Sequence, residues 1–182
     1  MYVGNKKTKS VYLGKKIVKA IYLGSKVIWN SVKPLNIIAS GAGIWDSTRY
    51  YTFNEDSIIF KMTSGSDTLR HTTQGVETYD LSKYKYLRIK GTSKKTSLEG
   101  ASGYSFGWRF MIYDIDTNTE LYRYSAPFEG TTENIIDEIL ELPDLTGINC
   151  QLKMYGTAGR NDDESLTVTA TFTQFEFTNS NS

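Results

Sequence analysis

The chain of 182 residues contains one cysteine, one histidine and three prolines. A lone Cys150 excludes an intramolecular disulfide. One Cys and one His are too few soft ligands for a zinc site. Any Ser-His-Asp or Cys-His mechanism would depend on His71 alone. The sequence therefore predicts no cofactor, no resident metal and no catalysis of these types.

Long apolar runs are also missing. No stretch of about 18 apolar residues is present, so we expect no membrane-spanning helix and no membrane partner. The start, Met1-Tyr2-Val3-Gly4, lacks the apolar segment of a secretory signal peptide, and we expect synthesis in a reducing cytoplasm. Lys+Arg number 21 and Asp+Glu 20. This balance argues against nucleic acid as the main partner.

The charges are unevenly distributed. Residues 1–33 carry eight Lys and no Asp or Glu, so every acidic residue lies in the rest of the chain. Two interpretations remain open: a basic arm that contacts a phosphate-rich surface, or lysines that protect exposed edge strands from aggregation.

A ten-residue repeat opens the chain. Tyr-Val-Gly at 2–4, Tyr-Leu-Gly at 12–14 and Tyr-Leu-Gly at 22–24 are followed by Asn5, Lys15 and Ser25. Each Gly-x pair fits a two-residue hairpin loop of type II′, because Gly tolerates a positive φ at the first position. The expected cross-strand pairs are Tyr12 with Ile17, Val11 with Val18, Tyr22 with Val27 and Ile21 with Ile28.

A meander this small cannot be stable alone. It has to pack on the rest of the chain, on another copy or on a partner. We therefore interpret residues 1–33 as a docking or assembly segment, with Tyr2, Tyr12, Tyr22 and Trp29 as its assembly residues.

These repeats resemble the short tandem repeats at the N-termini of tail and other virion proteins from phages of Firmicutes. The resemblance covers about 30 residues. It implies a virion structural protein that is made in the host cytoplasm, whose partners are other virion proteins or further copies of itself.

After Pro34, short β-rich runs alternate with turn signals, which is typical of a β-sandwich or barrel. The expected strands are Leu35–Ser40, Arg49–Phe53, Ser57–Met62, Val76–Tyr79, Tyr84–Lys90, Tyr104–Tyr113, Glu120–Ser125, Ile135–Leu142, Ile148–Tyr155 and Leu166–Phe177. The predicted fold is all-β: an N-terminal β-hairpin repeat meander over residues 1–33, followed by a jelly-roll-like β-sandwich over residues 34–182.

Period-two alternation assigns faces to these strands. Phe106, Trp108 and Phe110 share an apolar face, as do Cys150, Leu152 and Met154. In the last strand the apolar phase jumps between Phe172 and Phe175. A β-bulge near Thr173-Gln174 would return Phe175 and Phe177 to the core.

Two segments resemble galactose-binding-like jelly rolls: Leu142-Pro143-Asp144-Leu145-Thr146-Gly147 and Tyr79-Asp80-Leu81-Ser82-Lys83-Tyr84, each followed by an alternating run. For this reason we prefer a strand over a helix at 133–142. The resemblance covers roughly residues 35–178. Carbohydrate binding is common in that fold, although a fold does not establish a function.

Few residues point to other chemistry. We interpret His71 as a solvated residue of a surface hairpin and Cys150 as a buried structural thiol. Acidic residues in 114–120 and 161–164 superficially fit calcium loops, but a hairpin turn fits the first segment better and a solvated turn the second. No spacing picks out a carboxylate pair of the glycosidase type, so we expect a non-enzymatic protein.

What remains is aromatic and polar surface. Sugars stack on aromatic rings and hydrogen-bond to amides, carboxylates and Arg. The candidate carbohydrate-binding residues are Trp45 on a loop, with Asp46, Tyr50 and Tyr51 beside it, and Tyr86, Arg88, Arg109, Tyr113, Gln151, Lys153 and Tyr155 on outward faces. Rim packing or subunit contact is the alternative for each aromatic.

The leading hypothesis is a phage structural module whose repeats dock on the particle and whose sandwich projects and binds host cell-wall glycan. A stand-alone carbohydrate-binding module is one alternative. The other is a purely architectural capsid-decoration or tail-tip protein without a ligand.

Overall fold

The computed structural model describes the backbone of residues 2–3, 6–7, 11–13, 16–18, 20–23 and 26–30. It describes residues 32–40, 45–96, 105–159 and 165–180 more fully. Among these residues every element is a β-strand except one short helix, α1 (Ile37–Ser40), and the all-β prediction is confirmed. Within the described residues no helix is both long and apolar enough to cross a membrane.

The N-terminal repeats form one hairpin each. The strands pair as β1 (Tyr2–Val3) with β2 (Lys6–Lys7), β3 (Val11–Leu13) with β4 (Lys16–Val18), and β5 (Ala20–Leu23) with β6 (Lys26–Asn30). Leu13 faces Lys16 and Leu23 faces Lys26, so each loop has two residues as predicted. Pairing among the described residues stays within a repeat, which makes three two-stranded sheets instead of one continuous meander.

The expected register holds in the second repeat and partly in the third. Tyr12 faces Ile17, Val11 faces Val18 and Tyr22 faces Val27. Ile21, however, faces Trp29 and not Ile28, because a register shift between Ile21 and Tyr22 leaves one extra residue in β6. Tyr2, Tyr12, Tyr22 and Trp29 all lie in these strands, and the surroundings of their side chains fall outside the described part of the structure.

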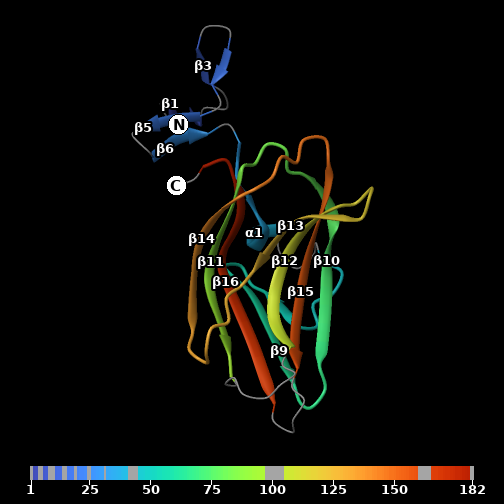
Figure 1. The fold of residues 1–182 in the computed structure, drawn as a ribbon. Helices are drawn as coiled ribbons and strands as arrows, with labels where there is room; N and C mark the ends of the chain where they lie inside the picture. Colours follow the sequence, from blue (N-terminus) through green and yellow to red (C-terminus); the bar gives the residue numbers. More distant parts are fainter. Residues whose placement is uncertain are drawn as a thin grey trace.

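Two antiparallel sheets pack into a sandwich (Figure 1). The four-stranded sheet runs β10 (Leu69–Asp80), β15 (Asn149–Gly159), β12 (Ser105–Asp114), β13 (Thr119–Ser125). The six-stranded sheet runs β14 (Asn134–Glu141), β11 (Tyr86–Lys95), β16 (Leu166–Thr178), β9 (Ile58–Ser64), β8 (Tyr51–Phe53), with β7 (Leu35–Asn36) beside the end of β16. From β9 onward the chain crosses between the sheets at every connection except the β12–β13 hairpin, so consecutive strands build both layers.

The first expected strand of the sandwich is wrong beyond Asn36. Residues Leu35–Ser40 were expected to be extended, but β7 ends at Asn36 and α1 follows. The Asn36 Oδ1 atom accepts hydrogen bonds from the backbone N–H of Ile38 at 3.0 Å and of Ala39 at 3.4 Å. Asn is a favoured helix N-cap for this reason, and its side chain turns the backbone into a helical turn.

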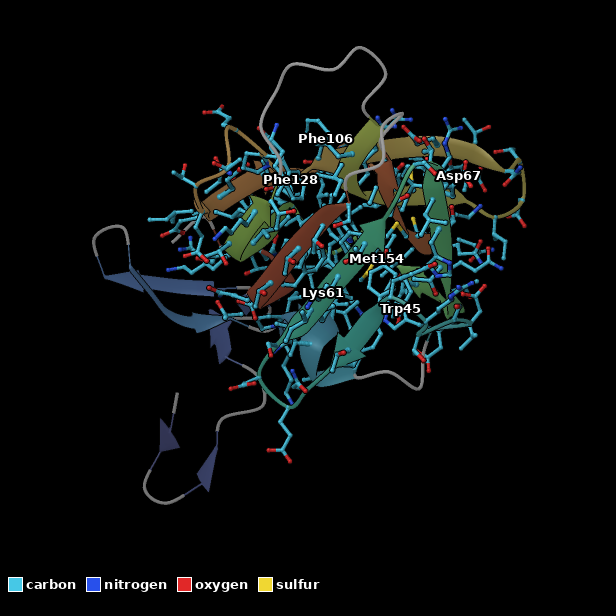
Figure 2. All side chains as sticks on the ribbon, turned by 90° about the horizontal axis from the view of Figure 1, so that it is seen from below. Trp45, Lys61, Asp67, Phe106, Phe128 and Met154 are labelled. Carbon is cyan, nitrogen blue, oxygen red and sulfur yellow. The ribbon has the colours of Figure 1, made fainter. Side chains whose placement is uncertain are left out.

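The core lies between the sheets and is rich in Phe. Trp108, Phe110, Phe172, Phe175 and Phe177 are all at most 1% exposed, and the end-on view of Figure 2 shows side chains such as Met154 filling this space. The predicted bulge is confirmed: Lys90 faces Gln174 while Gly91 faces Phe172, which leaves Thr173 unpaired. Gly91 is required at this point, because a Cβ there would collide with the Thr171 carbonyl oxygen.

The β10–β11 and β14–β15 connections, at one end of the sandwich, have the same hydrogen-bonded turn. Asp80 Oδ1 accepts hydrogen bonds from the N–H and hydroxyl of Ser82, and Asp144 Oδ1 does the same with Thr146. The leucine between them in each connection, Leu81 or Leu145, is at most 2% exposed. These are the two segments singled out from the sequence. Each uses an Asx turn to send a leucine into the end of the core while the chain changes sheet.

Candidate binding face on the four-stranded sheet

Five of the predicted site residues gather on the outward side of the four-stranded sheet. Arg109 faces Tyr155 across the β12–β15 ladder, Tyr113 faces Gln151, and Lys153 faces Met111 between them. Directly paired side chains on one face are in contact range. We call Arg109, Tyr113, Gln151, Lys153 and Tyr155 the four-stranded face.

Cations of the protein itself cover the two tyrosine rings of this face. Lys153 Nζ lies 3.9 Å from the centroid of the Tyr113 ring, and Arg109 Cζ lies 5.8 Å from the centroid of the Tyr155 ring. Both are cation–π geometries, which hold the rings in place. A sugar that stacked on the covered side of either ring would have to displace a cation.

The rim of the face carries an ion pair that the sequence analysis missed. Arg123 donates to both carboxylate oxygens of Glu120 at 2.9 and 2.8 Å, and Tyr113 Oη donates to Glu120 Oε2 at 3.2 Å. The hydrogen bonds from Arg123 lower the pKa of Glu120. Burial, together with the Glu120 charge, raises the pKa of Tyr113. At neutral pH the rim is therefore a carboxylate held by a guanidinium and a protonated phenol.

Met111 belongs to the same face and was not among the predicted site residues. It lies two residues from both Arg109 and Tyr113 along β12, so its side chain points to the same outward face, yet it is only 7% exposed. Its cross-strand partners are Lys153 and Arg123, whose long apolar stems can cover a neighbour while their charges stay in water. Alternation along β12 predicts that Met111 points outward. Its burial depends on side chains from two other strands, β13 and β15.

A hollow of about 360 Å³ adjoins the face at Arg109. It is bordered by Phe106, Phe128 and Glu129, and the rings of Phe106 and Phe128 meet edge to face with centroids 6.5 Å apart (Figure 2). It exists because the chain leaves the sheet after Ser125, the last residue of β13, so that the start of β12 pairs with β15 alone. Aromatic walls with one Arg and one Glu at the rim suit a ligand that is partly apolar and partly hydroxylated.

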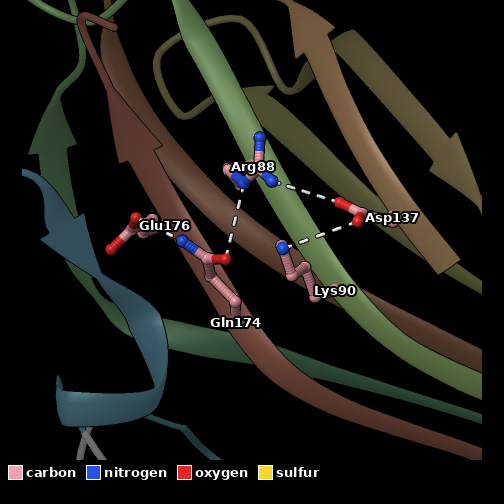
Figure 3. A network of polar contacts seen from close by, with 5 residues as sticks. All are labelled: Arg88, Lys90, Asp137, Gln174 and Glu176. Atoms are coloured by element: carbon pink, nitrogen blue, oxygen red, sulfur yellow. Dashed lines mark hydrogen bonds and ion pairs between the residues drawn. The ribbon is translucent and has the colours of Figure 1, made fainter. Parts of the chain in front are cut away.

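Tyr86 and Arg88 do not join this face. They lie on β11 in the other sheet, so their outward sides are on the opposite surface of the sandwich. Arg88 there contacts Asp137 at 3.2 Å and Gln174 at 3.4 Å (Figure 3). The prediction that Tyr86 and Arg88 lie with the other candidates is wrong for a simple reason. Alternation predicts which side of its own sheet a residue occupies, but not which sheet the strand enters.

Trp45 was expected on an exposed loop and is buried instead, at 6% exposed. It bridges to Gly75 at the edge of β10, and its ring stacks 6.1 Å from that of Phe53. Asp46 holds the segment in place by accepting hydrogen bonds from Thr73 Oγ1 at 2.6 Å and from the Gln74 N–H at 2.8 Å. Tyr51, named beside Trp45, is also buried, at 4% exposed. The rings of Trp45 and Tyr51 belong to the core, and Tyr50 packs partly buried against it.

His71 is the third residue of strand β10, where a surface hairpin was expected. Its Nε2 atom is 3.3 Å from Ser47 Oγ, and its ring packs against Tyr50. Burial lowers the pKa of His71, an effect that Asp46 partly offsets. A Ser-His pair needs a third group that orients the imidazole before it resembles a catalytic triad. In the described residues the Asp46 carboxylate is instead bonded to Thr73 and Gln74.

Residues 114–120 form the hairpin turn that the sequence favoured over a calcium loop. Asp114 accepts hydrogen bonds from the Asp116 N–H at 2.9 Å and the Thr117 hydroxyl at 2.8 Å, and Asn118 takes a positive φ of 53°. Across the described residues no group of three or more His, Cys, Asp and Glu side chains is placed to hold a metal. The second candidate, 161–164, lies outside the described residues.

No family model and no curated protein matches the chain. Among solved structures, a complex of Caldicellulosiruptor saccharolyticus CBM27-1 with mannohexaose aligns over 84% of this chain and 100% of its own, at a TM-score of 0.49 and 10% identity. A family 16 carbohydrate-binding module aligns over 74% of this chain and 92% of its own, at a TM-score of 0.42 and 13% identity. A structure of infectious bursal disease virus Gt strain aligns over 86% of this chain and 34% of its own, at a TM-score of 0.43 and 13% identity. All three TM-scores are below 0.5, so the fold rests on the strand pairing described above.

Proposed function

We propose that the protein is a non-enzymatic structural module of a phage virion that binds host cell-surface carbohydrate through the four-stranded face. In this proposal, residues 1–33 dock on the particle or on another copy and the sandwich projects. The observation that carries the carbohydrate part is the grouping of Arg109, Tyr113, Gln151, Lys153 and Tyr155 on two neighbouring strands.

The chemistry of the face suits a sugar. Tyr113 and Tyr155 supply rings, while Arg109, Gln151 and Lys153 supply hydrogen-bond donors. Glycoside hydrolysis needs two carboxyl groups set across a cleft. The acid that contacts the described part of this face is Glu120, and Arg123 neutralises it. These features support binding over turnover.

The virion part of the proposal rests on the repeats. Three hairpins of a few residues per strand bury too little surface to be stable by themselves, so they need a partner. Their resemblance to the N-terminal repeats of phage virion proteins suggests that this partner is another particle protein or a further copy of the chain.

Binding to cell-wall preparations of Gram-positive hosts and to a glycan array tests the carbohydrate part. Tyr155→Ala and Tyr113→Ala should each weaken binding about tenfold or more, which corresponds to about 1.4 kcal/mol. Tyr86→Ala is the matched control, because Tyr86 is a half-buried tyrosine on the opposite surface.

Thermal unfolding of all three variants shows whether each remains folded. Equal losses in Tyr86→Ala and the other two variants would refute the assignment of the face. If the unmodified protein binds no glycan and no cell wall, a purely architectural role follows.

A further inference from the structure

Strand β14 is an edge of the six-stranded sheet, and its outer side has no strand beside it in the described structure. It pairs over its whole length, Asn134–Glu141, with β11 on the inner side only. An edge strand of eight residues presents a row of backbone N–H and C=O groups that can pair with another strand. The edge is therefore a possible site for adding a strand.

The outward face of β14 exposes two isoleucines beside Asp137 and Glu141. Ile135 is 82% exposed and Ile139 is 37% exposed, and they are two of the four exposed large hydrophobic residues in the described part of the chain. Proteins commonly protect such edges with lysine or proline. Residues 133–141 contain neither, and no arginine, so this protection is absent here.

The same segment is acidic, with Glu133, Asp137, Glu138 and Glu141. Asp137 is balanced within the sheet by Arg88 at 3.2 Å and Lys90 at 3.5 Å (Figure 3), and Glu138 accepts a hydrogen bond from Tyr124. Glu133 and Glu141 have no ion pair within the described residues. The edge thus combines exposed isoleucines with two unbalanced carboxylates.

The complementary chemistry lies at the start of the chain. Residues 1–33 carry eight Lys and no acid, and β4 and β6 read Lys-Ile-Val and Lys-Val-Ile-Trp-Asn. Each hairpin is only two strands wide, so it also has edges to offer. We propose that an N-terminal hairpin of a second copy pairs with the β14 edge and extends the six-stranded sheet. This inference rests on the proposed assembly role of residues 1–33.

The other strands at sheet edges fit a basic hairpin less well. β10 and β13 each carry both signs of charge, and β8 has three residues. In Figure 1 the hairpins of the same chain lie beyond the end of the sandwich and not along β14, which leaves this edge open to a second copy.

Sedimentation velocity of the full chain over a concentration series tests the proposal. The unmodified protein should self-associate, and more weakly at high salt. Ile135→Lys with Ile139→Lys should weaken association at least tenfold, because the added charges repel the lysines of the hairpin. Val76→Lys with Ile115→Lys is the matched control, since it places two lysines on the other two exposed apolar positions. The control should associate like the unmodified protein.

A charge swap identifies the pairing partners. Glu133→Lys with Glu141→Lys should weaken self-association, and so should Lys16→Glu with Lys26→Glu. Mixing these two full-length variants should restore association, because one contributes a basic edge and the other an acidic hairpin.

A monomer at every concentration, or a loss in the Val76/Ile115 control equal to that in the Ile135/Ile139 variant, would overturn the proposal. So would a mixture that does not associate. If association depends on residues 1–31 but not on β14, the assembly role stands and only the β14 site falls.

Discussion

At the scale of single residues, the main surprise is how many polar aromatic groups are buried. The indole nitrogens of Trp45 and Trp108 and the hydroxyls of Tyr51 and Tyr79 have no hydrogen-bond partner in the described structure. Burial raises the pKa of Tyr51 far above its usual value, and the nearby Trp108 indole offsets only a small part without forming a regular hydrogen bond. Unpaired buried polar groups cost free energy. At Trp45, Trp108 and Tyr51 the rings are instead packed against other aromatic rings of the core.

Cys150 should behave as a buried thiol. It is 0% exposed, and burial, with smaller effects of Asp114 and Asp80, raises its pKa to about 11. Because the thiolate is the reactive form, labelling by a disulfide reagent at pH 8 should be slow in the native protein and fast in denaturant. Rapid labelling of the native protein would place the thiol at the surface.

His71 should make stability depend on pH. Burial holds its pKa below the ordinary 6.5, so the unfolded chain binds more protons in the window just below pH 6.5. Stability therefore rises with pH through that window and is fully present above it. The free energy of unfolding should fall between pH 7 and pH 5, and His71→Gln should reduce this slope. If the free energy of unfolding depends on pH in the same way in both proteins, His71 is not the source of the slope.

At the scale of elements, the last strand shows how one residue sets a register. In β16 the outward positions before the bulge are Thr167, Thr169 and Thr171, and the inward positions are apolar. Thr173 breaks the period, and Phe175 and Phe177 return to the core at 0% exposed. Without the extra residue, every later side chain would turn to the opposite face.

Deletion of Thr173 should therefore destabilise the protein severely. Turning Phe175 and Phe177 out of the core should cost about 5 kcal/mol or more, or prevent folding, because truncating one buried Phe already costs about 3–5 kcal/mol. Thr173→Ala is the control and should change stability by about 0.5 kcal/mol or less, since Thr173 is exposed. Urea denaturation measures both. A mild deletion phenotype would mean that the strand can pair in another register.

At the scale of the whole molecule, the sandwich has its own continuous core, whereas the hairpins pair only with themselves in the described residues. We therefore expect that deleting residues 1–31 leaves the unfolding midpoint of the sandwich nearly unchanged. The same deletion should abolish oligomerisation or incorporation into particles. Calorimetry and sedimentation check the two expectations. Normal assembly of the truncated protein would refute the docking role.

The features of this protein that follow from its amino-acid order alone are local ones. Hairpin loops of two residues, the inward phase of Trp108 and Phe110, and the bulge at Thr173 all follow from turn chemistry and a period of two. Each of these features depends on residues that are close together in the chain, so it can be predicted from the amino-acid order. Even the missed N-cap at Asn36 had a local signal.

Which strands share a sheet is set by the three-dimensional packing of the chain. This choice separates Tyr86 and Arg88 from Arg109, Tyr113 and Tyr155, although all five point outward. It also buries Trp45 against the edge of β10 and pairs β12 with β15, which forms the four-stranded face. Each of these depends on pairing between residues far apart in the chain, which is selected by the free energy of burying one common core and not by any segment alone.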